Sequence, residues 1–252
     1  MTTFASFDGT ELFYEDEGDG FPVILLHGFA ADTNLNYVRS GILDRLLDEG
    51  YRVIALDARG HGLSAKPHNP GAYADDAAGK DVQALLDETA IDACAVVGYS
   101  MGAGTLLRLA GHEPRIVVCV VLGVGETTLG TDARADRRAS MLDAFRTDDP
   151  ESLPEYAKAF RTMADAIHAD REALAAVLAA DEPSSVAGVA DIAQPVLVIA
   201  GVDDVHAGAP EPLAERIPNA TSARVPGDHF TSPSQPALHD AVVEFLATAP
   251  RA

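Results

Sequence analysis

Short runs of apolar residues recur along the chain, most of them without the alternation typical of a half-exposed strand. Continuous apolar runs indicate strands that are buried on both faces of a parallel sheet. Near the start, Asp8-Gly9 separates two shorter alternating segments, which favours a hairpin. These patterns predict eight strands, at residues 3–7, 11–16, 22–27, 51–57, 93–98, 116–122, 195–200 and 221–225.

Apolar positions at helical spacing lie between the predicted strands. They predict helices at residues 36–49, 75–90, 101–112 and 237–246, the first of which stops at Gly50, a common residue after a helix end. Strands that alternate with helices indicate a mostly parallel sheet with helices on both faces. The sequence therefore predicts an α/β fold.

One segment, residues 126–191, interrupts the alternation because it contains helical patterns and no strand pattern. Helices are predicted at 135–146, 153–167 and 171–180, and Pro150, Pro154 and Pro183 punctuate the segment. We interpret it as a helical cap, or lid, inserted into a core domain formed by residues 1–125 and 192–252.

Composition narrows the classes of partner. The 252 residues suit one α/β domain with an insertion, and 18 Lys+Arg against 39 Asp+Glu give a net charge of −21. Such a charge disfavours nucleic acids and anionic membranes as partners. The start of the chain lacks the pattern of a secretory signal, and no apolar run is long enough for a membrane helix. Cys94 and Cys119 lie in apolar runs that are typical of buried thiols. We expect a cytoplasmic monomer or homodimer.

The sharpest chemical signal is Gly98-Tyr99-Ser100-Met101-Gly102, between a predicted strand and a predicted helix. A serine at such a turn adopts a strained backbone that exposes its hydroxyl, and the flanking glycines avoid clashes with nearby backbone. The helix that begins at Met101 directs free N–H groups to the same place. Ser100 is therefore the predicted nucleophile.

A serine hydroxyl needs a base, and an imidazole needs a carboxylate to orient it. His229 follows the last predicted strand and is the best-placed base, while His206 and His168 remain candidates for a substrate contact. Asp204 follows the strand at 195–200 and is preferred as the acid. Asp203 and Glu126 are the alternatives.

The remaining parts of the predicted site lie in one loop and in the cap. The backbone N–H groups of Phe29 and Met101 are the expected oxyanion donors. Within the cap, a stripe of apolar residues either forms the cap's own core or covers an apolar pocket. The substrate-binding candidates are Phe29 in the loop and Met141, Phe145, Tyr156 and Phe160 in the cap. For Arg137, Arg138 and Arg146 a carboxylate-binding role is open, although we expect surface solvation.

Several motifs together make the sequence resemble the α/β-hydrolase superfamily. They are His27-Gly28-Phe29, residues 57–64 (DARGHGLS), Gly98-Tyr99-Ser100-Met101-Gly102, residues 201–204 (GVDD) and Gly227-Asp228-His229. The resemblance implies an eight-stranded sheet with a cap after the sixth strand, and a structural role for Asp57 and Arg59. Ser100 argues against the relatives that place aspartate at this position.

From the residues and the resemblance we predict a serine carboxylesterase that cleaves a small to medium ester through an acyl-enzyme, without metal or cofactor. The alternatives share the same triad. A carbon–carbon bond hydrolase needs a cationic clamp that the sequence does not make evident, and a cofactor-free haloperoxidase or perhydrolase would form peracid. A small-molecule sensor with an intact triad would turn over slowly.

Overall fold

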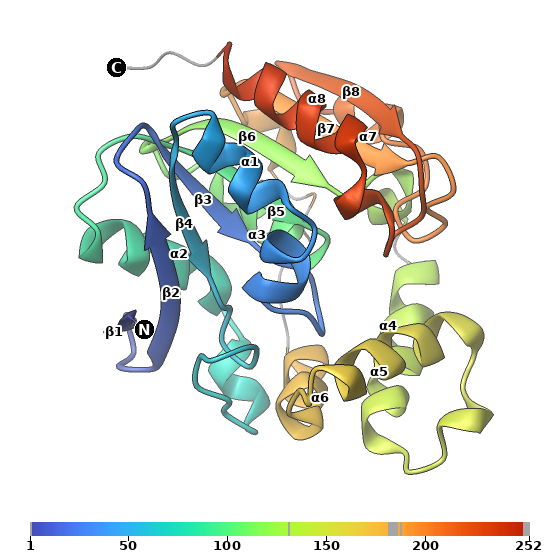
Figure 1. Cartoon of the computed structure of the whole chain (residues 1–252). Coiled ribbons are helices and arrows are strands. Elements are labelled where there is room, and N and C mark those ends of the chain that lie inside the picture. The colour runs from blue at the N-terminus through green and yellow to red at the C-terminus, as the bar shows by residue number, and fades with distance from the viewer. Residues whose placement is uncertain (1, 131, 181–185, 187, 249–252) are drawn as a thin grey trace.

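The computed structural model describes residues 2–130, 132–180, 186 and 188–248, and Pro183 of the predicted cap lies outside them. An eight-stranded sheet is present, as expected, and its strand order is β1-β2-β4-β3-β5-β6-β7-β8 (Figure 1). The pairs β1–β2 and β2–β4 are antiparallel and the other pairs are parallel. The strands are β1 (Thr2–Ala5), β2 (Glu11–Glu17), β3 (Pro22–Leu26), β4 (Arg52–Leu56), β5 (Cys94–Tyr99), β6 (Ile116–Leu122), β7 (Val196–Gly201) and β8 (Ala220–Val225).

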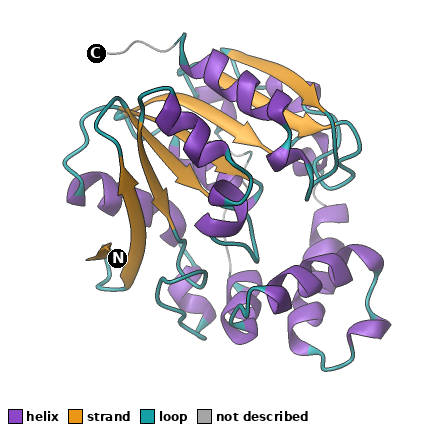
Figure 2. Ribbon diagram, in the orientation of Figure 1, coloured by secondary structure: helices purple, strands orange, loops and turns teal. Residues whose placement is uncertain are grey.

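Helices cover both faces of the sheet, which explains why the central strands are continuously apolar (Figure 2). Apolar side chains of α1 (Ile42–Asp48) and α8 (Pro236–Leu246) share one core cluster with the sheet. Those of α2 (Ala77–Glu88), α3 (Met101–Leu109) and the short α7 (Glu211–Ala214) belong to a second cluster. Two apolar cores therefore hold the sheet between two layers of helices.

Three further helices, α4 (Asp132–Arg146), α5 (Glu155–Ala166) and α6 (Arg171–Ala179), follow β6 and precede β7. They lie together, apart from the two helical layers, at the lower side of the view in Figure 1. We call residues 126–191 the helical insert. Its apolar residues, Phe145 and Phe160 among them, form a cluster of their own that also takes in Phe29 and Ala30 from the loop after β3. The helical insert thus packs directly on that loop.

The predicted helix at 36–49 differs from the structure, which breaks it in two. A π-helical turn at Asn34–Val38 ends before Gly41, and α1 starts at Ile42. Gly41 has φ +87°, a left-handed conformation that a continuing helix cannot contain. Ser40 completes the break by donating its hydroxyl to the carbonyl of Asn36 at 2.7 Å.

Cys94 and Cys119 are both buried in the sheet, and burial raises the pKa of each thiol to about 12.

None of the helices in the described part of the chain has the length and apolar character that crossing a membrane requires.

Candidate active site

Ser100 lies at the turn between β5 and α3, with φ 51° and ψ −102°. This is a strained conformation for a residue with a side chain. It requires close backbone approach on both sides: a Cβ on Gly98 would lie 2.5 Å from the Gly102 carbonyl oxygen, and a Cβ on Gly102 would lie 2.0 Å from that of Leu26. The glycines at these two positions therefore permit the sharp turn that presents the Ser100 hydroxyl.

His229 joins Ser100 to Asp204 in one hydrogen-bonded chain. Its Nε2 lies 3.1 Å from Ser100 Oγ, and its Nδ1 lies 2.9 Å from Asp204 Oδ2. The loop after β8 carries this imidazole, and the Tyr99 hydroxyl fixes the loop by donating to the His229 carbonyl at 2.6 Å. Three segments distant in sequence thus meet at the carboxyl edge of the parallel strands.

Asp204 is held as a carboxylate in a buried position, with 4% of its surface exposed. Its Oδ1 accepts the backbone N–H groups of His206 and Ala207, each at 2.9 Å. Burial raises the pKa of Asp204, but the hydrogen bonds from His229 and from the two N–H groups outweigh burial and lower it. Asp204 is therefore ionised near neutral pH and oriented toward the imidazole.

The alternative acids and bases lie elsewhere. Asp203 and Glu126 are exposed, and Glu126 accepts the Ala209 N–H at 3.3 Å. His168 is exposed as well. His206, by contrast, lies beside the triad, with its ring centroid 5.1 Å from that of His229. Burial and the neighbouring His229 lower the pKa of His206, which keeps this second imidazole neutral.

The loop after β3 is braced so that one of its N–H groups stays free. The Gly28 N–H donates to Asn36 Oδ1 at 2.7 Å, and the Ala30 N–H donates to His61 Nε2 at 3.2 Å. Within the described residues, the intervening Phe29 N–H has no hydrogen-bond partner, and the Met101 N–H at the start of α3 has none either. Both are available to an external acceptor near Ser100.

Loop residues of the motif at 57–64 brace this region. Asp57 accepts the N–H groups of Thr33 and Leu63 at 2.9 and 2.8 Å, and Arg59 pairs with buried Asp81 at 2.6 Å. These contacts suit the structural role that the resemblance implies for Asp57 and Arg59.

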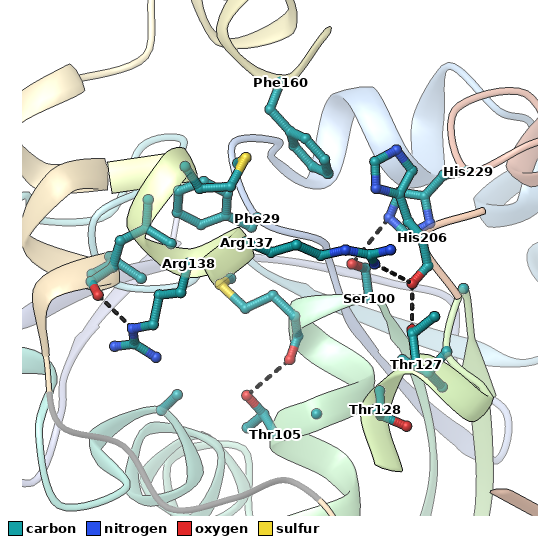
Figure 3. A pocket seen from close by; sticks show the side chains of 18 of the residues that line it. Phe29, Ser100, Thr105, Thr127, Thr128, Arg137, Arg138, Phe160, His206 and His229 are labelled. Carbon is teal, nitrogen blue, oxygen red and sulfur yellow. Dashed lines mark hydrogen bonds between the residues drawn. The ribbon is translucent and has the colours of Figure 1, made fainter. Parts of the chain in front are cut away.

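Ser100 opens onto two cavities of about 410 Å³ each. Phe29, Phe160 and His229 border both of them. The first cavity extends under the helical insert and is shown in Figure 3. The second is bounded by Leu35, Met163 and Phe230 among others.

The sequence-predicted pocket residues divide between cavity and core. Met141, Tyr156 and Phe160 line the first cavity, whereas Phe145 is buried behind Phe29, with their ring centroids 5.4 Å apart. Phe145 is not among the described residues that border either cavity. Phe145 has the same helical spacing as the residues that line the cavity, but it packs in the apolar cluster of the helical insert instead.

Two of the arginines expected on the solvated surface border the first cavity, and of these Arg137 is exposed as expected while Arg138 is half-buried. Arg137 and Arg138 of α4 both line it, while Arg146 of the same helix is exposed and does not. The sequence analysis also passed over Tyr73, Thr105, Thr127 and Thr128, which line the cavity from other elements. Nothing in their local sequence marks them, because their place depends on how loops and helices pack.

In the described part of the chain, no group of three or more His, Cys, Asp or Glu side chains is arranged to hold a metal ion.

Comparisons with known proteins agree with this fold. A family model for the alpha/beta hydrolase fold matches residues 22–155, more than half of the chain. A hydrolase from Pseudomonas aeruginosa PA01 has a similar structure, with a TM-score of 0.74 and 27% identity over 98% of each chain.

Two curated relatives match part of the sequence. The non-heme chloroperoxidase of Streptomyces lividans is 38% identical over 130 residues, which are 48% of this chain and 44% of that protein. The sn-1-specific diacylglycerol lipase of Mus musculus is 34% identical over 133 residues, 52% of this chain and 41% of that protein. The chain thus spans less than half the length of these curated relatives. On its fold and on the family match, the chain belongs to the alpha/beta hydrolase fold family.

Proposed function

We propose that the protein is a serine hydrolase that cleaves a carboxylic ester through an acyl-enzyme. The observation that carries the proposal is the chain of hydrogen bonds from Asp204 through His229 to Ser100. A hydroxyl, an imidazole and a buried carboxylate in this order activate a serine for attack on a carbonyl group.

In the first half of the reaction, Ser100 Oγ attacks the ester carbonyl carbon while His229 Nε2 takes the hydroxyl proton. Asp204 stabilises the imidazolium that forms and holds its Nδ1–H in place. The negative charge that develops on the carbonyl oxygen accepts hydrogen bonds from the Phe29 and Met101 N–H groups. The tetrahedral intermediate then collapses, and His229 returns the proton to the departing alcohol.

In the second half, water attacks the acyl-enzyme and gives its proton to His229. Ser100 leaves as the alcohol, takes the proton back, and the carboxylic acid is released. Closure of the site by the helical insert, acting as a cap with Phe160 above His229, limits the water that reaches the acyl group. The ring centroids of Phe160 and His229 are 6.0 Å apart.

The relative named as a diacylglycerol lipase supports an ester as the substrate class. The relative named as a non-heme chloroperoxidase favours a second activity, perhydrolysis. Hydrogen peroxide in place of water would attack the same acyl-enzyme and release a peracid, with no change in the roles of Ser100 and His229. Peracid formation from acetate and hydrogen peroxide tests this second activity.

The primary test compares wild type with Ser100→Ala on p-nitrophenyl esters of increasing acyl length. We expect the variant to lose at least about 10³-fold in kcat/KM, as removal of a triad nucleophile does. A fluorophosphonate should label wild type on the peptide that contains Ser100 and leave the variant unlabelled. Hydrolysis that survives Ser100→Ala at the wild-type rate would reject the proposal.

A further inference from the structure

The first cavity has a charge opposite to that of the chain. Four arginines border it, Arg59, Arg108, Arg137 and Arg138, and no Asp or Glu is among the described residues that line it. The chain as a whole carries 39 acidic against 18 basic residues. A cavity lined by one sign of charge concentrates ligands of the other sign.

Two of these arginines form ion pairs with carboxylates that do not line the cavity. Arg59 forms ion pairs with Asp81 at 2.6 Å and with Asp8 at 3.0 Å. Arg108 forms one with Asp76 at 2.7 Å. Their charges are therefore satisfied by the protein itself.

Arg137 and Arg138 have no such partner, since no described carboxylate lies within ion-pair distance of either. Arg138 turns toward α6 and donates to the carbonyls of Leu178 and Ala180. Arg137 extends toward Ser100 and His206 in Figure 3. Its one hydrogen bond among the described residues is a long one, 3.5 Å from Nη1 to the His206 carbonyl. Most of its N–H groups remain free to bind a ligand.

Four of the hydroxyl groups that line the first cavity already donate to backbone carbonyls. Thr127 donates to the carbonyls of His206 and Ala207, and Thr128 to that of Gly125. Tyr73 donates to the Pro67 carbonyl at 2.6 Å, and Thr105 to that of Met101 at 3.3 Å. The guanidinium of Arg137 is therefore the strongest hydrogen-bond donor still available beside Ser100.

We propose that the substrate carries a carboxylate on the half that occupies the first cavity, and that Arg137 binds it. A planar guanidinium matches a carboxylate in a bidentate, charge-assisted contact. The remainder of that half packs against the apolar wall of Phe29, Met141 and Leu178. The inference rests on the proposed function and narrows its substrate class to esters with an anionic end.

The first experiment measures binding without turnover. Ser100→Ala protein is titrated by calorimetry with the monomethyl esters of succinic, glutaric and adipic acids, and with the dimethyl esters, which differ in charge. We expect one of the monoesters to bind at least about tenfold more tightly than its diester. A difference of this size is what one hydrogen bond to a charged group contributes to binding. Adding Arg137→Gln should remove this preference, and adding Arg137→Lys should restore part of it.

Arg146→Gln is the matched control, because it removes the same charge from the same helix at an exposed position outside the cavity. The control should keep the preference for the monoester. If the diesters bind as well as all three monoesters, or if the preference survives Arg137→Gln, the inference is wrong.

A second experiment separates this inference from the proposed function. In otherwise wild-type protein, the ratio of kcat/KM for monoester over diester should fall about tenfold in Arg137→Gln. Hydrolysis that depends on Ser100 but shows no charge preference would overturn the inference alone. Anion binding through Arg137 without any Ser100-dependent hydrolysis would overturn the proposed function, and with it the ester class, and would leave Arg137 only as an anion-binding residue.

Discussion

Asp204 Oδ2 lies 2.9 Å from the Nδ1 of His229, whereas the side chain of Asp203, one residue earlier, is exposed to solvent. The two neighbouring acids therefore differ in what they can do for the imidazole. We predict that Asp204→Asn lowers kcat for ester hydrolysis by about 10³-fold or more, because an amide cannot stabilise the imidazolium and favours the wrong tautomer. Asp203→Asn is the control and should stay within a few fold of wild type. Steady-state kinetics checks both, and the reverse ranking would contradict the assignment.

The brace on the loop after β3 gives a second prediction. The side chain of Asn36 accepts the Gly28 N–H at 2.7 Å, next to the free N–H of Phe29. Asn36→Ala should let this loop relax and misplace the Phe29 N–H, which lowers kcat more than it raises KM. The expected loss is about 10-fold, smaller than the loss of a whole oxyanion donor. An unchanged kcat with a raised KM would instead indicate a role in binding alone.

Phe160 borders both cavities and is in ring contact with Phe29 and Phe230. Phe160→Ala should join the cavities and shift the preferred p-nitrophenyl ester toward longer acyl chains. Phe145→Ala is the control, because Phe145 is equally apolar and buried in the same cluster but does not border the cavities. We expect both variants to be destabilised by about 3–5 kcal/mol, and only Phe160→Ala to change chain-length preference. A shift in both variants would mean that loosening of the helical insert is the cause.

His61 provides a test through stability rather than activity. It is buried, its Nε2 accepts the Ala30 N–H, and burial, aided by nearby His27, lowers its pKa from 6.5 to about 3. Between these values the unfolded chain binds a proton that the folded protein excludes. The free energy of unfolding should therefore decrease as the pH falls below 6.5, by up to about 1.4 kcal/mol for each pH unit.

The measurement compares urea unfolding of wild type and His61→Gln at about pH 7 and about pH 4.5. Carboxylates titrate in both proteins and cancel in the difference. Wild type should lose more stability than the variant on acidification. Equal losses would show that His61 does not carry this dependence.

The sequence predicted the sheet well because buried parallel strands need continuous apolar runs, and each of the eight predicted segments overlaps an observed strand. It failed at Gly41, because Val38, Ile42 and Leu46 keep helical spacing across the break. Spacing does not report that a glycine between them adopts a left-handed conformation.

The meeting of Ser100, His229 and Asp204 could be anticipated for a related reason: each follows a strand of one parallel sheet, and the ends of such strands share an edge. Which of the cap arginines border a cavity could not be decided from the sequence, although a carboxylate-binding role was open for Arg137, Arg138 and Arg146. Arg137 and Arg138 belong to a strongly polar helix, and their orientation depends on how α4 packs against α6 and the loop after β3.

The residues proposed for the chemistry lie outside 126–191, whereas Arg137 and Phe160 lie within that single uninterrupted stretch. Under these proposals, the groups that perform the reaction and two of the side chains that select the substrate lie in separate stretches of the chain. If both proposals hold, exchanging that stretch for the equivalent one of another family member should change the substrate while Ser100, His229 and Asp204 stay in place, which makes it a natural unit for engineering.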